Sequence, residues 1–142
     1  MEITYINTTL EDADNLVEIR IASMKESLER IGRFDPRRAR ARFLTSFAPE
    51  NTKYILLEGS KIGFVVVKFT ANEMSLDHLY IQPEHQGKGI GTAVLNAVFA
   101  EADLKSLPVT VGALRESASN RFYQRHGFVK SGETELDIYY VR

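Results

Sequence analysis

Three glycines within five residues, Gly87, Gly89 and Gly91, place the tightest constraint on how this chain folds. They follow Met74–Ile81, a run typical of a strand, and lead into Ile90–Leu104, which has the length and composition of a helix. Glycine adopts left-handed conformations and lets a ligand approach the backbone closely. The free N–H groups and positive end of the following helix suit an anion such as a pyrophosphate. The sequence therefore predicts a strand, an anion-binding loop and a helix, in this order.

Two helices are predicted before residue 50. Ile3–Ile6 alternates as a short strand, and Thr8 with Glu11 is predicted to form the capping box of the first helix. The second helix is expected to begin at Asp35 and Pro36, a capping acid followed by proline. The apolar residues that these helices are expected to bury are Leu10, Ala13, Val17, Ile21, Met24, Leu28 and Ile31 in the first, and Phe43, Leu44 and Phe47 in the second.

From residue 54 onward, β-rich runs dominate and two helices interrupt them. The segment Glu58–Lys61 separates two such runs and predicts a hairpin, and Gly127 is expected to close the last helix. The predicted strands are Tyr54–Leu57, Ile62–Phe69, Met74–Ile81, Val109–Leu114, Phe128–Lys130 and Leu136–Val141, and the predicted helices are Ile90–Leu104 and Ser117–His126. The order β-α-α-β-β-β-α-β-α-β-β indicates a mixed α/β domain with a central sheet.

Composition favours a single domain over residues 1–142, because this is an ordinary domain length and no repeat or linker interrupts it. The net charge of −1 argues against nucleic acid or an anionic membrane as partner. Cysteine is absent, which excludes disulfides, thiolate metal ligands and a cysteine nucleophile, and favours the cytoplasm. The three histidines are too scattered to predict a metal site. We expect neither a membrane helix nor a signal peptide.

Two common anion-binding loops do not match this one. A P-loop requires Ser or Thr directly after its lysine, but Gly89 follows Lys88. A dinucleotide-binding fingerprint that begins at Gly87 requires glycine where Thr92 stands. The pattern that remains is [RQ]-x-x-G-x-[GA], which begins at Gln86. With this loop the sequence resembles the GNAT superfamily of acyl-CoA-dependent N-acetyltransferases.

The resemblance extends over two segments. Leu79–Gly91 looks like the strand, loop and helix start of that family, and Arg121–Phe128 looks like its second motif, a short helix that closes in Gly-Phe. The resemblance implies a mixed, mostly antiparallel (α+β) sheet flanked by helices, and acetyl-CoA as cosubstrate without a metal. The acceptor would be a primary amine of a small molecule, a peptide or protein N-terminus, or a lysine. It also makes a homodimer plausible.

The resemblance also implies roles for single residues. Tyr123 matches the tyrosine that protonates or hydrogen-bonds the leaving thiolate. The family often has asparagine seven residues earlier, where this chain has Glu116, so Asn120, one helical turn later, is expected to take over part of the pantetheine contact. The other residues expected to bind the cofactor are Leu79, Tyr80 and Ile81 along its acyl arm, and Gln86, Gly87, Lys88, Gly89, Ile90, Gly91 and Thr92 around its phosphates.

Several alternatives stay open at this stage. Without a nucleophile for a covalent intermediate, direct attack by the amine is expected, with Asp77 or His78, on opposite faces of their strand, as general base. The more distant Glu73 or a water chain could take that proton instead. The other interpretations are that Asp77 is an ordinary solvated or paired strand residue and that Tyr123 is a core residue with a satisfied hydroxyl. A non-catalytic acyl-CoA sensor or scaffold is the alternative function, and amine-dependent thiol release would distinguish it from an enzyme.

Overall fold

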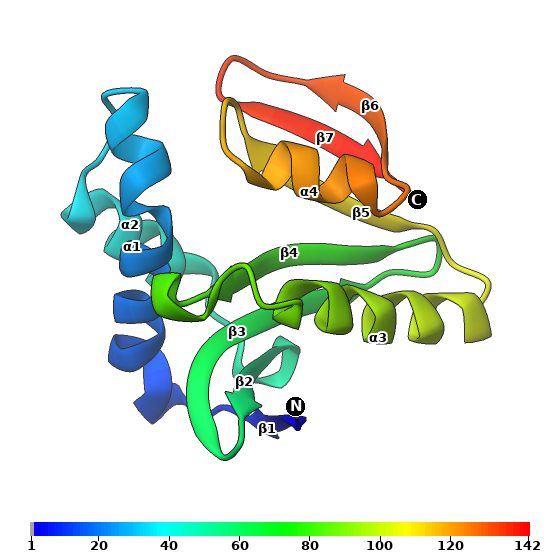
Figure 1. Cartoon of the computed structure of the whole chain (residues 1–142), viewed down its shortest axis with the longest axis horizontal. Helices are drawn as coiled ribbons and strands as arrows, with labels where there is room; N and C mark the ends of the chain where they lie inside the picture. The colour runs from blue at the N-terminus through cyan, green and yellow to red at the C-terminus, as the bar shows by residue number, and fades with distance from the viewer. Residues whose placement is uncertain (1) are drawn as a thin grey trace. The chain divides into compact units, whose positions relative to one another are not determined.

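The computed structural model describes residues 2–142 and confirms the predicted order of strands and helices (Figure 1). The helices are α1 (Ala13–Arg30), α2 (Pro36–Ser46), α3 (Ile90–Leu104) and α4 (Ser119–Arg125), and the strands are β1 (Ile3–Asn7), β2 (Thr52–Leu57), β3 (Ser60–Phe69), β4 (Met74–Ile81), β5 (Val109–Leu114), β6 (Val129–Glu133) and β7 (Asp137–Val141). Within residues 2–142, the helices fall short of the length and apolar character that crossing a membrane requires.

The seven strands form one mixed sheet in the order β1-β2-β3-β4-β5-β7-β6. Pairing is antiparallel between β1 and β2, β2 and β3, β5 and β7, and β6 and β7. It is parallel between β4 and β5, where Met74–Leu76 lies opposite Val109–Val111. This arrangement confirms the predicted mixed α/β class with a sheet flanked by helices.

The chain divides into two compact units, and each is described by itself. The first unit comprises residues 2–66 and 78–91, and the second comprises residues 67–77 and 92–142. The boundaries fall inside β3, β4 and α3, so these elements each contribute residues to both units. That residues 1–142 form a single domain therefore remains a prediction.

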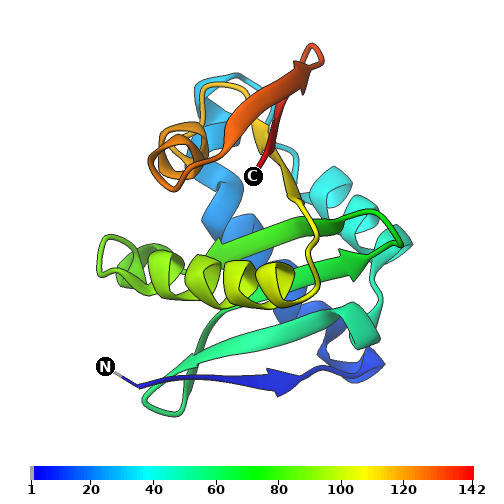
Figure 2. The same ribbon diagram turned by 90° about the vertical axis from the view of Figure 1, so that its right-hand side faces the viewer.

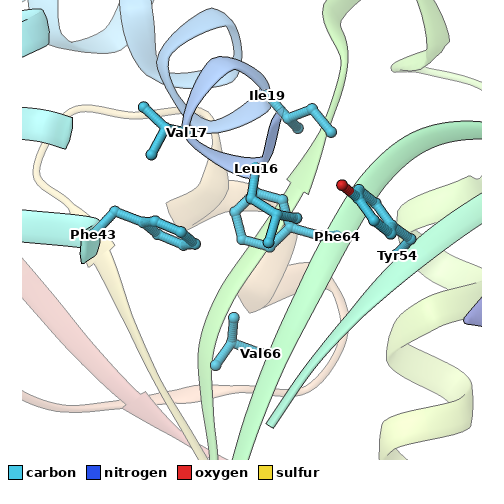
Figure 3. Close-up of a cluster of buried hydrophobic side chains, with 7 residues drawn as sticks. All are labelled: Leu16, Val17, Ile19, Phe43, Tyr54, Phe64 and Val66. Atoms are coloured by element: carbon cyan, nitrogen blue, oxygen red, sulfur yellow. The ribbon is translucent and has the colours of Figure 1, made fainter. Parts of the chain in front are cut away.

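The core of the first unit lies where α1 and α2 meet β2 and β3. Figure 3 shows one cluster of its buried side chains, Leu16, Val17, Ile19, Phe43, Tyr54, Phe64 and Val66. The ring of Phe43 stacks on Phe47 at 5.2 Å and meets Phe64 edge-on at 5.6 Å. Beneath these helices, β1 runs alongside β2 (Figure 2). Aromatic packing thus holds α2 against the sheet.

The start of α1 differs from the prediction. The capping box is formed by Thr9 and Asp12, not by Thr8 and Glu11, because a 3₁₀ turn over Leu10–Asp12 precedes the α-helix. The backbone N–H of Thr9 donates to Asp12 at 2.9 Å and lowers the pKa of that carboxyl. A 3₁₀ turn has three residues per turn and breaks the helical phase. Leu10 is consequently 73% exposed, which contradicts its predicted place on the buried face.

The start of α2 is confirmed, since Asp35 accepts a hydrogen bond from the N–H of Arg38 and Pro36 is the first helical residue. Its predicted buried side is only partly correct. Phe43 is buried with Ala39, four residues before it, whereas Leu44 is exposed. Residues four apart share one face of a helix, and the next residue turns away from it.

Other boundaries also differ from the prediction by one to three residues, among them those of β3 and α4. The hairpin turn is Glu58–Gly59, both at positive φ (48° and 84°), so β3 begins at Ser60 and not at Ile62. Positive φ at both central residues is the geometry of the tight turns that suit the twist of a hairpin. α4 spans Ser119–Arg125, shorter at each end than predicted, while Gly127 takes the expected left-handed conformation at φ 91°.

In the second unit, α3 and α4 lie on one face of the strands. The ring of Tyr140 in β7 faces Tyr123 of α4 at 6.4 Å, and the guanidinium of Arg142 lies 4.0 Å from the ring centre of Phe99 in α3. Figure 1 shows α4 running along β5 and β7. Side chains alternate along a strand, so Tyr139 points to the opposite face. The two tyrosines therefore have different surroundings, Tyr140 buried and Tyr139 exposed.

Candidate functional site

The glycine-rich loop has the backbone that its sequence predicted. Gly87 and Gly89 have φ values of 74° and 81°, and Gly91 lies in the first turn of α3. Left-handed φ is costly for any residue with a Cβ atom. Lys88, between the two left-handed glycines, is exposed. The loop thus delivers the chain directly to the N-terminus of α3, where the first N–H groups lack partners within the helix.

Side-chain hydrogen bonds hold the start of this loop against the end of β4. The carbonyl oxygen of Ile81 accepts from the side-chain amide of Gln86 at 2.8 Å and from the hydroxyl of Ser23 in α1 at 3.2 Å. The N–H of Gln82 donates to the carbonyl of Ile62 at 2.8 Å. Gln86 was predicted as a cofactor residue, and the structure shows its side chain bracing the loop. Ser23 was missed, because a serine within a helix gives no sequence signal for this contact.

The end of β4 turns two aromatic side chains toward the core of the first unit. The rings of His78 and Tyr80 stack at 5.5 Å, His78 lies 6.3 Å from Phe43, and Tyr80 lies 5.3 Å from Phe64. The His78 Nδ1 atom is also 3.3 Å from the Tyr80 hydroxyl. Leu79 points to the opposite face by strand alternation. A contact between Tyr80 and the pantetheine arm of a cofactor would therefore be made by its main-chain atoms, because its ring packs against the core.

A glycine in the neighbouring strand permits the position of this segment. A Cβ atom on Gly63 of β3 would overlap the carbonyl oxygen of Tyr80 and would lie 3.2 Å from the Cα of Ile81. Only glycine leaves room for so close a backbone approach. Gly63 could not be predicted as a contact residue from sequence, since an isolated glycine in a strand identifies neither its neighbour nor the distance between them.

Asp77, one of the two candidate bases, has two polar partners within the second unit. Its carboxylate lies 3.2 Å from the Nζ of Lys68 and accepts a hydrogen bond from the hydroxyl of Ser75. These two contacts tie the carboxylate to neighbouring residues of β3 and β4. They agree with the alternative that Asp77 is a paired strand residue. His78 belongs to the first unit.

Tyr123 lies on the buried face of α4. Its side chain is 6% exposed, and its ring packs edge-on against Phe128 at 5.3 Å and near Tyr140 at 6.4 Å. The carbonyl of Tyr123 accepts from the N–H groups of His126 and Phe128, which closes the helix at the Gly-Phe pair. The second motif thus fixes the Tyr123 ring through the packing of the residues that follow it.

Both the nitrogen and the oxygen of the Asn120 side-chain amide form hydrogen bonds within the protein. Its Nδ2 donates to the carbonyls of Leu114 at 2.9 Å and Ser117 at 3.0 Å, and its Oδ1 accepts from the hydroxyl of Tyr140 at 2.8 Å. This network ties the start of α4 to β5 and β7. The cofactor contact expected of Asn120 stays a prediction, and the structure adds a bracing role. Glu116 has φ 70°, a conformation that asparagine tolerates better than glutamate.

Replacing Asn120 tests this bracing role. Asn120→Ala would remove the acceptor of the Tyr140 hydroxyl and one donor from each of two carbonyls, which keep their backbone N–H partners. We expect a loss of about 1–3 kcal/mol in the free energy of unfolding. Urea unfolding measures it, with Tyr140→Phe as the matched partner in a double-mutant cycle. A neutral Asn120→Ala would contradict the bracing role. An unchanged cofactor dissociation constant in the folded variant would contradict the expected cofactor contact.

Thr92, in the first turn of α3, has its hydroxyl within hydrogen-bond distance of a histidine ring. Its Oγ1 lies 3.0 Å from Nε2 of His126, whose Nδ1 lies 2.7 Å from the carbonyl oxygen of Phe122. From sequence His126 was predicted only as the end of a helix, so its link to Thr92 was missed. Among residues 2–142 no group of three His, Asp or Glu side chains is arranged to hold a metal ion.

Comparisons with known proteins agree with this geometry. The acetyltransferase (GNAT) domain family matches residues 49–130, which is more than half of the chain. No curated protein matches the chain significantly. The chain is similar in fold to PaiA N-acetyltransferase from Thermoplasma acidophilum in complex with coenzyme A, with 20% identity, a TM-score of 0.81, and coverage of 100% of this chain and 99% of that one.

Two proteins from Escherichia coli show the same fold. They are the apo form of YjaB (17% identity, TM-score 0.80, 99% of this chain and 97% of that one) and the ribosomal-protein-S18-alanine N-acetyltransferase (15% identity, TM-score 0.71, 99% and 92%). The structural likenesses support the fold, and the family match covers β4, the glycine loop and α4. The chain therefore belongs to the GNAT family of acetyltransferases.

Proposed function

We propose that this acetyltransferase moves the acetyl group of acetyl-CoA to a primary amine by direct attack in a ternary complex. The loop Gln86–Gly91 carries the proposal, because Gly87 and Gly89 hold left-handed conformations just before the N-terminus of α3. Glycine-built loops that end in a helix N-terminus suit a pyrophosphate. The similar PaiA structure is a complex with coenzyme A, which supports the same cofactor here.

In this proposal each segment contacts a different part of the cofactor. The main chain of Gln86–Gly91, with Lys88 and Thr92, binds the pyrophosphate. Ile90 contributes only its N–H, because its side chain is 1% exposed. The main chain of Leu79–Ile81 binds the pantetheine arm. The packing of the His78 and Tyr80 rings against the core of the first unit supports a main-chain role for this strand.

The chemistry requires two proton transfers. The neutral amine attacks the thioester carbonyl carbon, a C–N bond forms, the C–S bond breaks, and the sulfur leaves as a thiolate. The hydroxyl of Tyr123 gives its proton to that sulfur, since a phenol is protonated at neutral pH. Asp77 or His78, directly or through water, takes the proton that the amine loses. The acceptor is a small-molecule amine, a peptide or protein N-terminus, or a lysine.

A thermal-shift titration with acetyl-CoA, free CoA and ATP tests the cofactor. A ligand at 100 times its dissociation constant adds about 2.7 kcal/mol to the free energy of unfolding. This raises the midpoint by roughly 5 °C or more for a domain of this size. We expect a shift with both CoA species and none with ATP. No shift with either CoA species at millimolar concentration would contradict the proposed function.

Matched glycine variants locate the cofactor site. Gly89→Ala places a Cβ on a left-handed residue and is expected to weaken or abolish the CoA-dependent shift. Gly132→Ala in β6 serves as control, because its added Cβ meets nothing within 4 Å. Amine-dependent release of the CoA thiol then separates an enzyme from a non-catalytic sensor. Binding without such release would favour the sensor.

A further inference from the structure

His126 joins the end of α4 to the first turn of α3. Its two ring nitrogens have different partners, the carbonyl oxygen of Phe122 at 2.7 Å from Nδ1 and the hydroxyl of Thr92 at 3.0 Å from Nε2. Both His126 and Thr92 are half-buried and belong to the second unit. The proposed function leaves this link between the two helices without a purpose.

These partners determine where the protons lie. A carbonyl oxygen only accepts, so Nδ1 of His126 must carry a proton to make its bond with Phe122. In the neutral ring Nε2 then has only a lone pair. The hydroxyl of Thr92 must donate its single proton to that lone pair. With neutral His126, therefore, the Thr92 hydroxyl has no proton left to offer an anion.

Protonation of the ring reverses the direction of one hydrogen bond. In the imidazolium both nitrogens donate, so Nε2 donates to Thr92 Oγ1 and the bond to Phe122 is unchanged. The hydroxyl proton of Thr92 is then free to turn to another acceptor. Thr92 is the third residue of α3, in the turn whose N–H groups favour an anion.

We propose that His126 is a positioning residue for the cofactor pyrophosphate and acts through Thr92. Taking a proton from solvent, His126 releases the Thr92 hydroxyl to donate to a pyrophosphate oxygen, and it adds positive charge behind that hydroxyl. Cofactor binding therefore tightens as His126 is protonated. By linkage, the bound cofactor favours the imidazolium. This inference rests on the proposed function, because it requires the pyrophosphate at the start of α3.

The charged side chains of α4 nearest to His126 in sequence are Arg121 and Arg125, and both are exposed. The residue of α3 that faces the His126 ring is Thr92, which carries no charge. The first acidic residue of α3, Glu101, is nine positions further on, about 13 Å along the helix axis. In this proposal the pyrophosphate supplies the negative charge at the start of α3.

The test measures the dissociation constant of dephospho-CoA between about pH 5.5 and 8.5, the range in which histidine titrates. This probe keeps the pyrophosphate but lacks the 3′-phosphate, which would titrate in the same range. We expect wild-type affinity to rise roughly ten-fold toward low pH, the size of one charge-assisted hydrogen bond. Thr92→Val and His126→Gln are expected to lose this rise, whereas His85→Gln, a histidine outside the link, retains it.

The outcomes separate the two proposals. Binding of dephospho-CoA without pH dependence in the wild type, or a rise that persists in Thr92→Val, overturns the role of His126 and leaves the proposed function intact. Failure of the wild type to bind any CoA species overturns both. A second measurement needs no variant: nitrogen NMR of the unliganded protein must show the neutral His126 ring protonated at Nδ1. Protonation at Nε2 in the neutral ring overturns the inference.

Discussion

Tyr123→Phe is expected to lower the rate of acetyl transfer at saturating acetyl-CoA and amine by about 100-fold or more, the usual contribution of a general acid. The variant keeps the ring that packs against Phe128 and Tyr140, so its stability should change little. The hydroxyl that is the proposed proton donor for the leaving thiolate is lost. The measurement is CoA thiol release at several pH values, with the CoA dissociation constant determined in parallel and expected to stay nearly the same.

Tyr5→Phe is the control for this experiment, since Tyr5 lies in β1 outside the proposed machinery. It should retain wild-type turnover. A Tyr123→Phe enzyme with wild-type turnover would contradict the acid role and favour the alternative that Tyr123 is a core tyrosine. A loss of CoA binding as large as the loss of rate would indicate a binding role instead.

Gly63→Ala is expected to destabilise the protein by about 2–4 kcal/mol, in the range of overpacked core substitutions. The added Cβ would overlap the Tyr80 carbonyl oxygen, which is main chain and cannot move aside as a side chain does. Relief requires a shift of β4 near Ile81, whose carbonyl anchors Gln86 and Ser23. Urea unfolding measures the loss of stability, and CoA titration of the folded variant should show weakened binding.

Gly132→Ala controls for the change of residue type within a strand. Its Cβ enters open space, so its stability should stay within about 0.5 kcal/mol of the wild type. Equal stabilities of Gly63→Ala and Gly132→Ala would show that β4 accommodates a side chain at position 63. The close approach of β3 to Tyr80 would then have no energetic importance.

Elements whose ends are marked by residue types that begin or end a helix or strand could be predicted from sequence. β4, α3 and β5 have the predicted bounds, Met74–Ile81, Ile90–Leu104 and Val109–Leu114, because glycine, proline or a change of hydrophobic period marks their ends. The start of α2 was also predicted correctly, from Asp35 and Pro36. The start of α1 was not, since two neighbouring threonines each had an acid three residues later and local sequence could not choose between them.

Some features of the candidate site could likewise be predicted from sequence, and others could not. The conformations of Gly87 and Gly89 followed from residue type, because glycine alone adopts them at low cost. One hydrogen bond of Asn120, by contrast, depends on Tyr140, twenty residues further along the chain. One of those to the Ile81 carbonyl depends on Ser23, which lies 58 residues earlier. No periodicity or spacing predicts such pairs, because each is made only when strands and helices come together.

By itself, the sequence determined the order of the elements, the glycine loop and the residue types available for acyl transfer, since these follow from local propensity and composition. Only the tertiary structure decided which partners those residues contact. It gave Asp77 a lysine partner, turned His78 toward aromatic rings, bound Asn120 within a brace and linked Thr92 to His126. The physical reason is that a polar side chain takes its role from the partner it meets, and folding supplies that partner from distant parts of the chain.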